Sequence, residues 1–133
     1  MNAIYFETHF RTGEPVEDWP AEFAIITAYA TTGENWPLER NEHEDAKLQA
    51  ELDRRNVWHR RITGYHPDSG HAEPGWAAEL SFPDACRLGE QFVQDAIYFV
   101  MNGLLAVSEC KDGRRVLVPV GRFAERVDRK MSM

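Results

Sequence analysis

The sequence lacks the features typical of membrane-spanning, secreted or disulfide-rich proteins. No apolar run approaches the ~18 residues needed to cross a bilayer, so no membrane partner is expected. The first ten residues contain no basic segment followed by an apolar one, so we expect no secretory signal and a reducing, cytoplasmic location. There are only two cysteines, Cys86 and Cys110, and in that location we expect both to be free thiols.

Motifs for nucleophilic catalysis, phosphate binding and structural zinc are also missing. The chain has no Gly-x-Ser-x-Gly sequence, and neither cysteine has an adjacent histidine. No glycine-rich loop of the phosphate-binding type is present, and the cysteines match no zinc-ligand spacing. These absences lead us to expect no cofactor and no metal.

Composition and charge are those of one globular domain over residues 1–133. The chain is 43% hydrophobic and 28% charged, which indicates a folded core rather than disorder. Residues 1–53 hold twelve acidic and three basic side chains, a net charge of −9, whereas residues 54–133 hold ten acidic and twelve basic ones, a net charge of +2. Because nucleic-acid binders concentrate positive charge on one face, nucleic acid is not expected as a partner.

The order of hydrophobic patterns predicts the α+β class. We expect two helices packed on a largely antiparallel mixed sheet as a single pair of layers, and a crossover through the first helix would allow one parallel strand pair. The near-continuous apolar run from residue 22 to residue 29 indicates a central strand that is buried on both faces. The predicted elements are an arm or edge strand over 3–10, a loop over 13–20, strands over 22–29, 57–65, 75–80, 96–101, 104–110 and 115–120, helices over 37–55 and 83–94, and a polar tail over 121–133.

Two local signals locate element boundaries. Ser81 can cap the second helix, with Asp84 three residues later facing the N-terminal amides. Asn102-Gly103 predicts a two-residue hairpin between the strands on either side of it.

One stripe of the first helix combines leucines with polar residues. Leu38, Asn41, Asp45, Leu48 and Leu52 are spaced three or four apart, so they share one face, and the leucines should direct that face to the core. Asn41 and Asp45 would then point inward, where polar groups need partners. Either they pin the backbone of a neighbouring loop, or this end of the helix opens over a pocket and the pair faces a ligand.

Further polar residues lie where elements end. Thr27 and Tyr29 close the central strand, and ligands commonly gather outside the carboxyl ends of strands, although such residues also simply pack. Gln94 lies two residues before a predicted buried strand, so it has little room to lie far from the sheet.

The loop over residues 66–74 carries His71 and Glu73, which are possible metal or acid–base groups. Imidazole and carboxylate bind zinc, and a carboxylate can orient a histidine for proton transfer. The spacing matches no zinc signature, and a loop rich in His, Asp and Gly is also typical of a plain polar turn.

Several segments occur in an order and spacing that resemble a known family. They are Phe23-Ala-Ile-Ile-Thr-Ala-Tyr29, the helix from Glu39 through Leu52, Gly64-Tyr-His-Pro67, His71-Ala-Glu73-Pro74, Leu88-Gly-Glu-Gln-Phe92 and Gln94-Asp-Ala-Ile-Tyr-Phe99. Across residues 22–110 the chain resembles the bacterial family called domain of unknown function 3293. The resemblance implies a compact bacterial cytoplasmic domain and implies no reaction. Asparagine is common in that family where this chain has Asp45, and small or polar residues where it has Trp76, so the resemblance carries no ligand contact over to Asp45.

The positional and family-like residues lead to one functional hypothesis. We expect Thr27, Asn41, Glu73 and Gln94 to converge on a pocket beside the central strand. The full candidate site is Thr27, Tyr29, Asn41, Asp45, His71, Glu73 and Gln94. Hydroxyls, amides and carboxylates orient ligands, so we expect a non-catalytic module that binds a small molecule or a protein.

One alternative is a hydrolase or transferase that uses His71 and Glu73 as an acid–base or metal set. Another is an acidic inhibitor or immunity-type partner of a basic protein.

Overall fold

The apolar run after residue 21 forms β2 (Glu22–Thr27), the middle strand of a seven-stranded sheet. A computed structural model describes residues 1–31 and 34–128, and within it each neighbouring pair of strands is antiparallel. The sheet has the order β1-β3-β4-β2-β5-β6-β7. The other strands are β1 (His9–Arg11), β3 (His59–Tyr65), β4 (Ala72–Ala78), β5 (Ala96–Met101), β6 (Leu104–Glu109) and β7 (Val118–Arg122).

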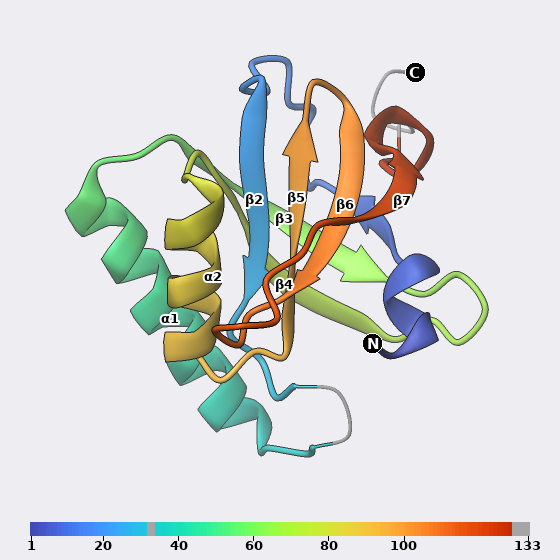
Figure 1. Cartoon of the computed structure of the whole chain (residues 1–133). Helices are drawn as coiled ribbons and strands as arrows, with labels where there is room; N and C mark the ends of the chain where they lie inside the picture. The colour runs from blue at the N-terminus through green and yellow to red at the C-terminus, as the bar shows by residue number, and fades with distance from the viewer. Residues whose placement is uncertain (32–33, 129–133) are drawn as a thin grey trace.

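Two α-helices, α1 (Leu38–Arg55) and α2 (Phe82–Gln91), lie together on one face of this sheet (Figure 1). Two short 3₁₀ helices, η1 (Ala3–Phe6) and η2 (Phe123–Glu125), lie near the two ends of the chain. This architecture confirms the predicted α+β class. Neither α-helix in the described part of the chain combines the length and apolarity that a bilayer span requires.

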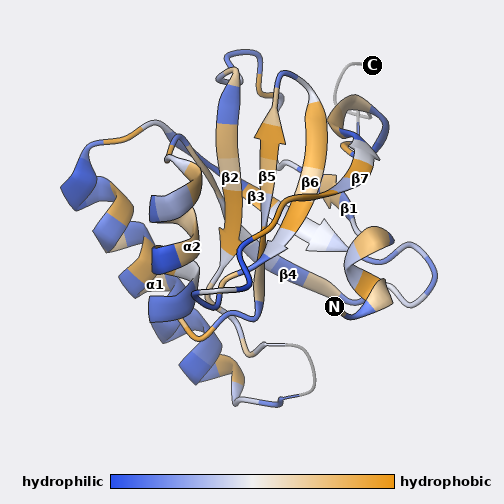
Figure 2. Cartoon of the chain, viewed as in Figure 1, coloured by the Kyte–Doolittle hydropathy of each residue, from blue (hydrophilic) through white to orange (hydrophobic). Residues whose placement is uncertain are grey.

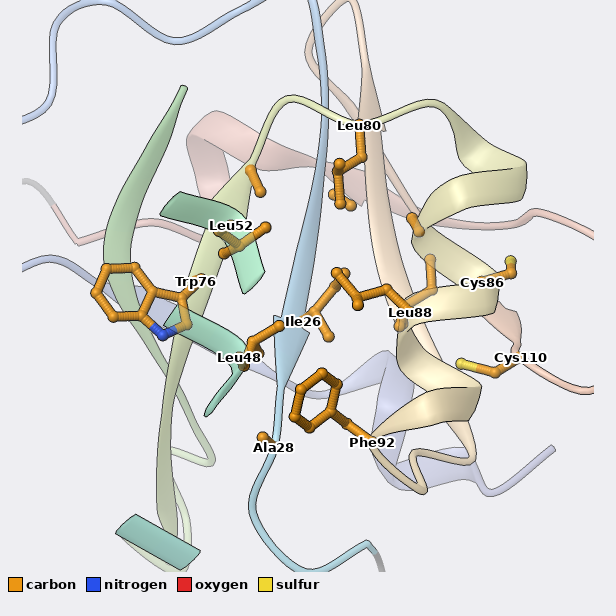
Figure 3. Close-up of a cluster of buried hydrophobic side chains, with 14 of the residues drawn as sticks. Ile26, Ala28, Leu48, Leu52, Trp76, Leu80, Cys86, Leu88, Phe92 and Cys110 are labelled. Carbon is orange, nitrogen blue, oxygen red and sulfur yellow. The ribbon is translucent and has the colours of Figure 1, made fainter. Parts of the chain in front are cut away.

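β2 holds the fold together because both of its faces are buried. Ala24 and Ile26 point toward the helices and pack with Leu48, Leu88 and Phe92 (Figure 3). The strand's other face belongs to a second cluster, formed by Phe10, Phe23, Ile25, Ile62, Ala77, Val100, Leu105 and Phe123. Because the central strands are buried on both faces, β2, β5 and β6 consist mostly of hydrophobic residues (Figure 2). The second cluster adds an inner core to the predicted single pair of layers.

The sheet curls until its two edges are linked by backbone hydrogen bonds. The amide of Phe10 in β1 donates to the carbonyl of Arg126 at 2.7 Å, and the amide of Asp128 donates to the carbonyl of Phe10 at 2.8 Å. Phe10 and Val127 form an isolated parallel bridge. The hydroxyl of Tyr65 in β3 donates to the Asp128 carboxylate at 2.6 Å. The segment that follows β7 therefore holds β1 in place.

Both local boundary signals are confirmed. The Ser81 hydroxyl accepts a hydrogen bond from the Asp84 amide at 3.2 Å and so caps α2. Asn102 and Gly103 have φ angles of 50° and 85°, the left-handed conformations that a tight two-residue hairpin needs.

Element bounds differ from the predictions at several places. Residues 3–10 form η1 and the three-residue β1 instead of one extended strand. β4 begins at Ala72, inside the predicted loop, and α2 ends at Gln91 because Val93 has a φ of 60° and leaves the helix. The last strand covers Val118–Arg122, and the predicted polar tail contains buried Phe123, while residues 129–133 lie outside the described part. None of the described strand pairs in the sheet is parallel.

Both cysteines are buried free thiols, as predicted. Both lie in the helix-side core, the hydrophobic cluster between the two α-helices and the sheet that includes Ile26, Leu48 and Leu88. Burial there raises the pKa of the Cys110 thiol to about 12 and also raises the pKa of the Cys86 thiol. Both sulfur atoms are therefore protonated at neutral pH and poor nucleophiles.

The predicted leucine stripe of α1 is confirmed at two of its three positions. Leu48 and Leu52 are fully buried, whereas Leu38 is 63% exposed. The prediction for Leu38 is wrong because the first turn of α1 extends past the end of β2 and has no sheet surface to cover (Figure 1).

The contrast between Leu48 and Leu38 predicts opposite results for the same substitution. Leu48→Ala should lower the free energy of unfolding by about 2–5 kcal/mol, because it leaves a cavity between α1 and the sheet. Leu38→Ala should change it by less than about 0.5 kcal/mol, since its side chain is already in water. Urea unfolding followed by tryptophan fluorescence measures both values. Equal losses would contradict this placement of α1.

Candidate functional site

A cavity of about 550 Å³ opens at the carboxyl end of β2, on the face of the sheet opposite the helices. Its walls come from η1, strands β1 to β5, the connection that leads from β2 to α1, the first turn of α1 and the connection between α2 and β5. Six of the seven candidate residues line it, namely Thr27, Tyr29, Asn41, His71, Glu73 and Gln94. The structure thus brings together the four residues expected to converge. Their role in binding stays a prediction.

The cavity exists because the strands carry small residues at this end. Gly64 in β3 pairs with Glu73 in β4, and Ala96 starts β5. Beside the cavity, Gly75 pairs with Thr27, and an added Cβ at Gly75 would lie 2.6 Å from the carbonyl oxygen of Ile26. Strand β4 can therefore approach β2 closely only without a side chain at this position.

Gln94 joins the end of β2 to the connection between α2 and β5. Its carbonyl oxygen accepts a hydrogen bond from the Thr27 hydroxyl at 2.9 Å. Its amide nitrogen donates to the carbonyl of Tyr29 at 2.8 Å and to that of Phe92 at 3.2 Å. Both amide hydrogens are used, so Gln94 fixes the wall of the cavity.

Asn41 holds the same peptide unit, between Tyr29 and Ala30, from the side of α1. Its side-chain oxygen accepts a hydrogen bond from the amide of Ala30 at 2.9 Å, which pins the start of the connection between β2 and α1. This is the loop-pinning alternative predicted from its place on the helix stripe. The amide nitrogen of Asn41 has no hydrogen-bond partner among the described residues, so a donor remains for a ligand.

Asp45 does not line the cavity and instead forms an ion pair between α1 and β3. Its two carboxylate oxygens each accept a hydrogen bond from the Arg61 guanidinium, both at 2.8 Å. Arg61 in turn lies 4.0 Å from the ring centroid of Trp76. The stripe pattern correctly places Asp45 inward, but its partner is a side chain of β3 and not a ligand or a loop backbone.

His71 and Glu73 form a pair at the rim of the cavity. His71 Nε2 lies 2.9 Å from Glu73 Oε2, and the two side chains are 62% and 28% exposed. The rings of His66 and His71 stack with their centroids 6.5 Å apart. Within the described ranges, no group of three or more His, Cys, Asp or Glu residues is placed to hold a metal ion.

Tyr98 is a cavity residue that sequence reasoning missed. Its hydroxyl donates to the carbonyl of Tyr5 at 2.8 Å and lies 2.8 Å from the Thr8 hydroxyl. Burial raises the pKa of Tyr98 well above its usual range, so the phenol is neutral. The alternation of side chains along β5 could have indicated its position. Ile97 and Phe99 face the helices, so Tyr98, which lies between them, faces the opposite side of the sheet.

Burial and nearby carboxylates both disfavour the ionised form of Tyr29. Burial raises the pKa of its phenol first, and the carboxylates of Asp45, Glu42 and Glu73 raise it further against the opposing effect of Arg61. The cavity wall at Tyr29 therefore disfavours an added negative charge.

The Asp45–Arg61 pair predicts a measurable energetic coupling. Asp45→Asn and Arg61→Gln should each lower the free energy of unfolding by about 1–2 kcal/mol, since each leaves a partly buried partner without its charge-assisted hydrogen bonds. The double variant should lose less than the sum of the two losses. Glu44→Gln, which breaks the single contact of a half-buried carboxylate with the exposed Lys47, is the control and should change little. Additive losses at Asp45 and Arg61 would contradict the pairing.

Comparison with known proteins identifies the family. A family model described as "Protein of unknown function (DUF3293)" matches residues 26–97, which is more than half of the chain. No curated protein and no solved structure gives a significant match. The matched range contains all six candidate residues that line the cavity. This finding confirms the resemblance seen in the sequence, and the chain belongs to the DUF3293 family.

Proposed function

We propose that this protein is a non-catalytic module that binds a small molecule in the cavity at the carboxyl end of β2. The observation that supports the proposal is one cavity of about 550 Å³ that gathers polar groups from distant parts of the chain. Small-molecule sites typically have volumes of about 300–1,000 Å³ and a few well-placed polar groups among apolar ones. This cavity has both properties, with Phe10 and Ile25 among its apolar lining residues.

The walls of the cavity are preorganised by hydrogen bonds that need no ligand. Gln94 holds the end of β2, Asn41 holds the following connection, and the Tyr98 hydroxyl holds η1 through the carbonyl of Tyr5. Preorganisation reduces the conformational entropy that binding would otherwise cost. A rigid polar wall on a sheet is therefore suited to specific binding.

The hydroxyl groups in the cavity favour binding over nucleophilic chemistry. The Thr27 hydroxyl donates to the Gln94 carbonyl oxygen, which is not a general base. The Thr8 hydroxyl lies against the Tyr98 hydroxyl. A serine or threonine nucleophile needs a neighbouring base to take its proton, and neither of these hydroxyls is hydrogen-bonded to one within residues 1–31 and 34–128.

The pair of His71 and Glu73 supports a second candidate function, acid–base catalysis of hydrolysis or group transfer. The 2.9 Å contact between Nε2 and Oε2 is the arrangement in which a carboxylate orients an imidazole. The imidazole lies at the open rim, where a substrate held in the cavity can reach it.

A cavity-filling variant tests the binding proposal. Ala96→Leu places a larger side chain at the cavity wall, so we expect fragments that bind the wild-type chain to lose binding. Ala50→Leu makes the same change on the exposed face of α1 and should leave binding intact. Ligand-observed NMR with a chemically diverse fragment set measures both. Fragments that bind all three proteins equally, or no binding at all, would contradict the proposal.

Histidine variants separate the two candidate functions. For a binding module we expect His71→Ala to hydrolyse p-nitrophenyl acetate at the same background rate as His43→Ala, a change on the exposed face of α1. A loss of about 100-fold confined to His71→Ala, the size typical of a removed general acid or base, would instead favour the enzyme. Circular dichroism checks that both variants are folded.

A further inference from the structure

The permanently charged groups in the described cavity lining are negative, and its two histidines, His66 and His71, are the lining groups that become positive when protonated. Among the described residues the lining includes the carboxylates of Glu34 and Glu73 and no lysine or arginine. The arginines of neighbouring elements have partners of their own. Arg61 binds Asp45, and Arg126 donates to the carbonyls of Phe6 and Thr8, both at 3.0 Å. A phosphate or carboxylate ligand would therefore meet no guanidinium or ammonium group in the described lining.

Glu73 lines the cavity and has an acceptor that makes no hydrogen bond within the described part of the chain. One oxygen, Oε2, contacts His71, while Oε1 has no hydrogen-bond partner among the described residues. The side chain is 28% exposed, so it is neither fully solvated nor closed off by protein. A carboxylate oxygen in this state accepts strong hydrogen bonds from an ammonium or guanidinium group.

Aromatic rings complete the walls. Tyr29, Trp36 and Tyr98 line the cavity, and the face of an aromatic ring carries partial negative charge that attracts cations. The protein already uses this attraction at one of these rings, because the guanidinium of Arg40 lies 3.8 Å from the ring centroid of Trp36. The carboxylates of Asp45, Glu42 and Glu73 act in the same direction, since they add to the effect of burial in raising the pKa of the Tyr29 phenol.

We propose that the ligand of this cavity carries a positively charged amine or guanidinium, with Glu73 as its charge partner and the rings of Tyr29 and Tyr98 as its walls. This inference rests on the proposed binding function and specifies its ligand class. The free amide hydrogens of Asn41 provide a second contact, to a hydroxyl or carbonyl acceptor on the same molecule. The ligand is thus a small amine with a neutral acceptor group.

Three compounds that share a 4-hydroxyphenyl ring test the charge of the ligand. Tyramine ends in an amine, tyrosol in an alcohol and 4-hydroxyphenylacetate in a carboxylate. Titration of each into the isotope-labelled full chain, followed by NMR, gives its Kd and shows whether cavity residues respond. We expect tyramine to bind about tenfold more tightly than tyrosol, the factor expected of one charge-assisted contact with an aromatic wall. The carboxylate should bind most weakly.

A matched pair of variants assigns the preference to Glu73. Glu73→Gln keeps the shape of the side chain and removes its charge, so tyramine should lose its advantage over tyrosol. Glu79→Gln makes the same change in charge six residues further along, about 20 Å away on an extended chain, and should keep the advantage.

The outcomes distinguish this inference from the binding proposal. Equal affinity for tyramine and tyrosol, or equal effects of the two glutamate variants, would overturn charge recognition at Glu73 while the cavity still binds ligands. If none of the three compounds shifts cavity resonances but other fragments do, the inference fails and the binding proposal stands. Failure of every fragment would remove both.

Discussion

The burial of β2 on both faces is the constraint on which the rest of the structure depends. One face supports the two helices, and the other forms the inner cluster around Phe10 and Phe23. A strand in this position must be apolar where it is buried, and β2 is apolar between its exposed first residue, Glu22, and its last residue, Thr27. The first polar side chain after the buried run therefore appears at the cavity. Position and chemistry of the site both follow from where the core ends.

The cavity is held by contacts between segments that are distant in the sequence. Gln94 connects to Thr27 and Tyr29 across more than sixty residues, and Tyr98 connects to Thr8 across ninety. Each contact replaces a hydrogen bond to water by one inside the protein, so each contributes only about 1 kcal/mol. Their larger effect is geometric, because they leave few ways for the walls to move.

Much of this fold follows from local sequence signals. Much of the site follows from polar residues at positions where the hydrophobic pattern predicts burial. The apolar run, the Ser81 cap and the Asn102-Gly103 hairpin each act within a few residues, so their structures were predictable. Gln94 was also predictable, since the short step between helix and strand leaves it no other place. Asp45 was placed inward correctly, but no local pattern connects it to Arg61, its actual partner.

Other features were beyond sequence reasoning because their partners lie at the far end of the chain. Residues 3–10 were expected to form an edge strand or an extended arm. Instead β1 pairs with both β3 and the segment around Val127, and residues 3–6 form η1. Tyr98 reads as one more apolar residue in an apolar strand. Its role depends on the curl of the sheet, which brings η1 over it.

The bridge between Phe10 and Val127 has a consequence for how the protein is made. It joins residues separated by 117 positions, among the most distant contacts the described chain contains. During synthesis η1 and β1 emerge long before the residues that fasten them. Because contacts between such distant residues form slowly, the wall that η1 contributes should be completed late, after the central strands have paired. A ribosome-bound chain that stops short of residue 126 would contain both helices and the whole helix-side core without a finished cavity.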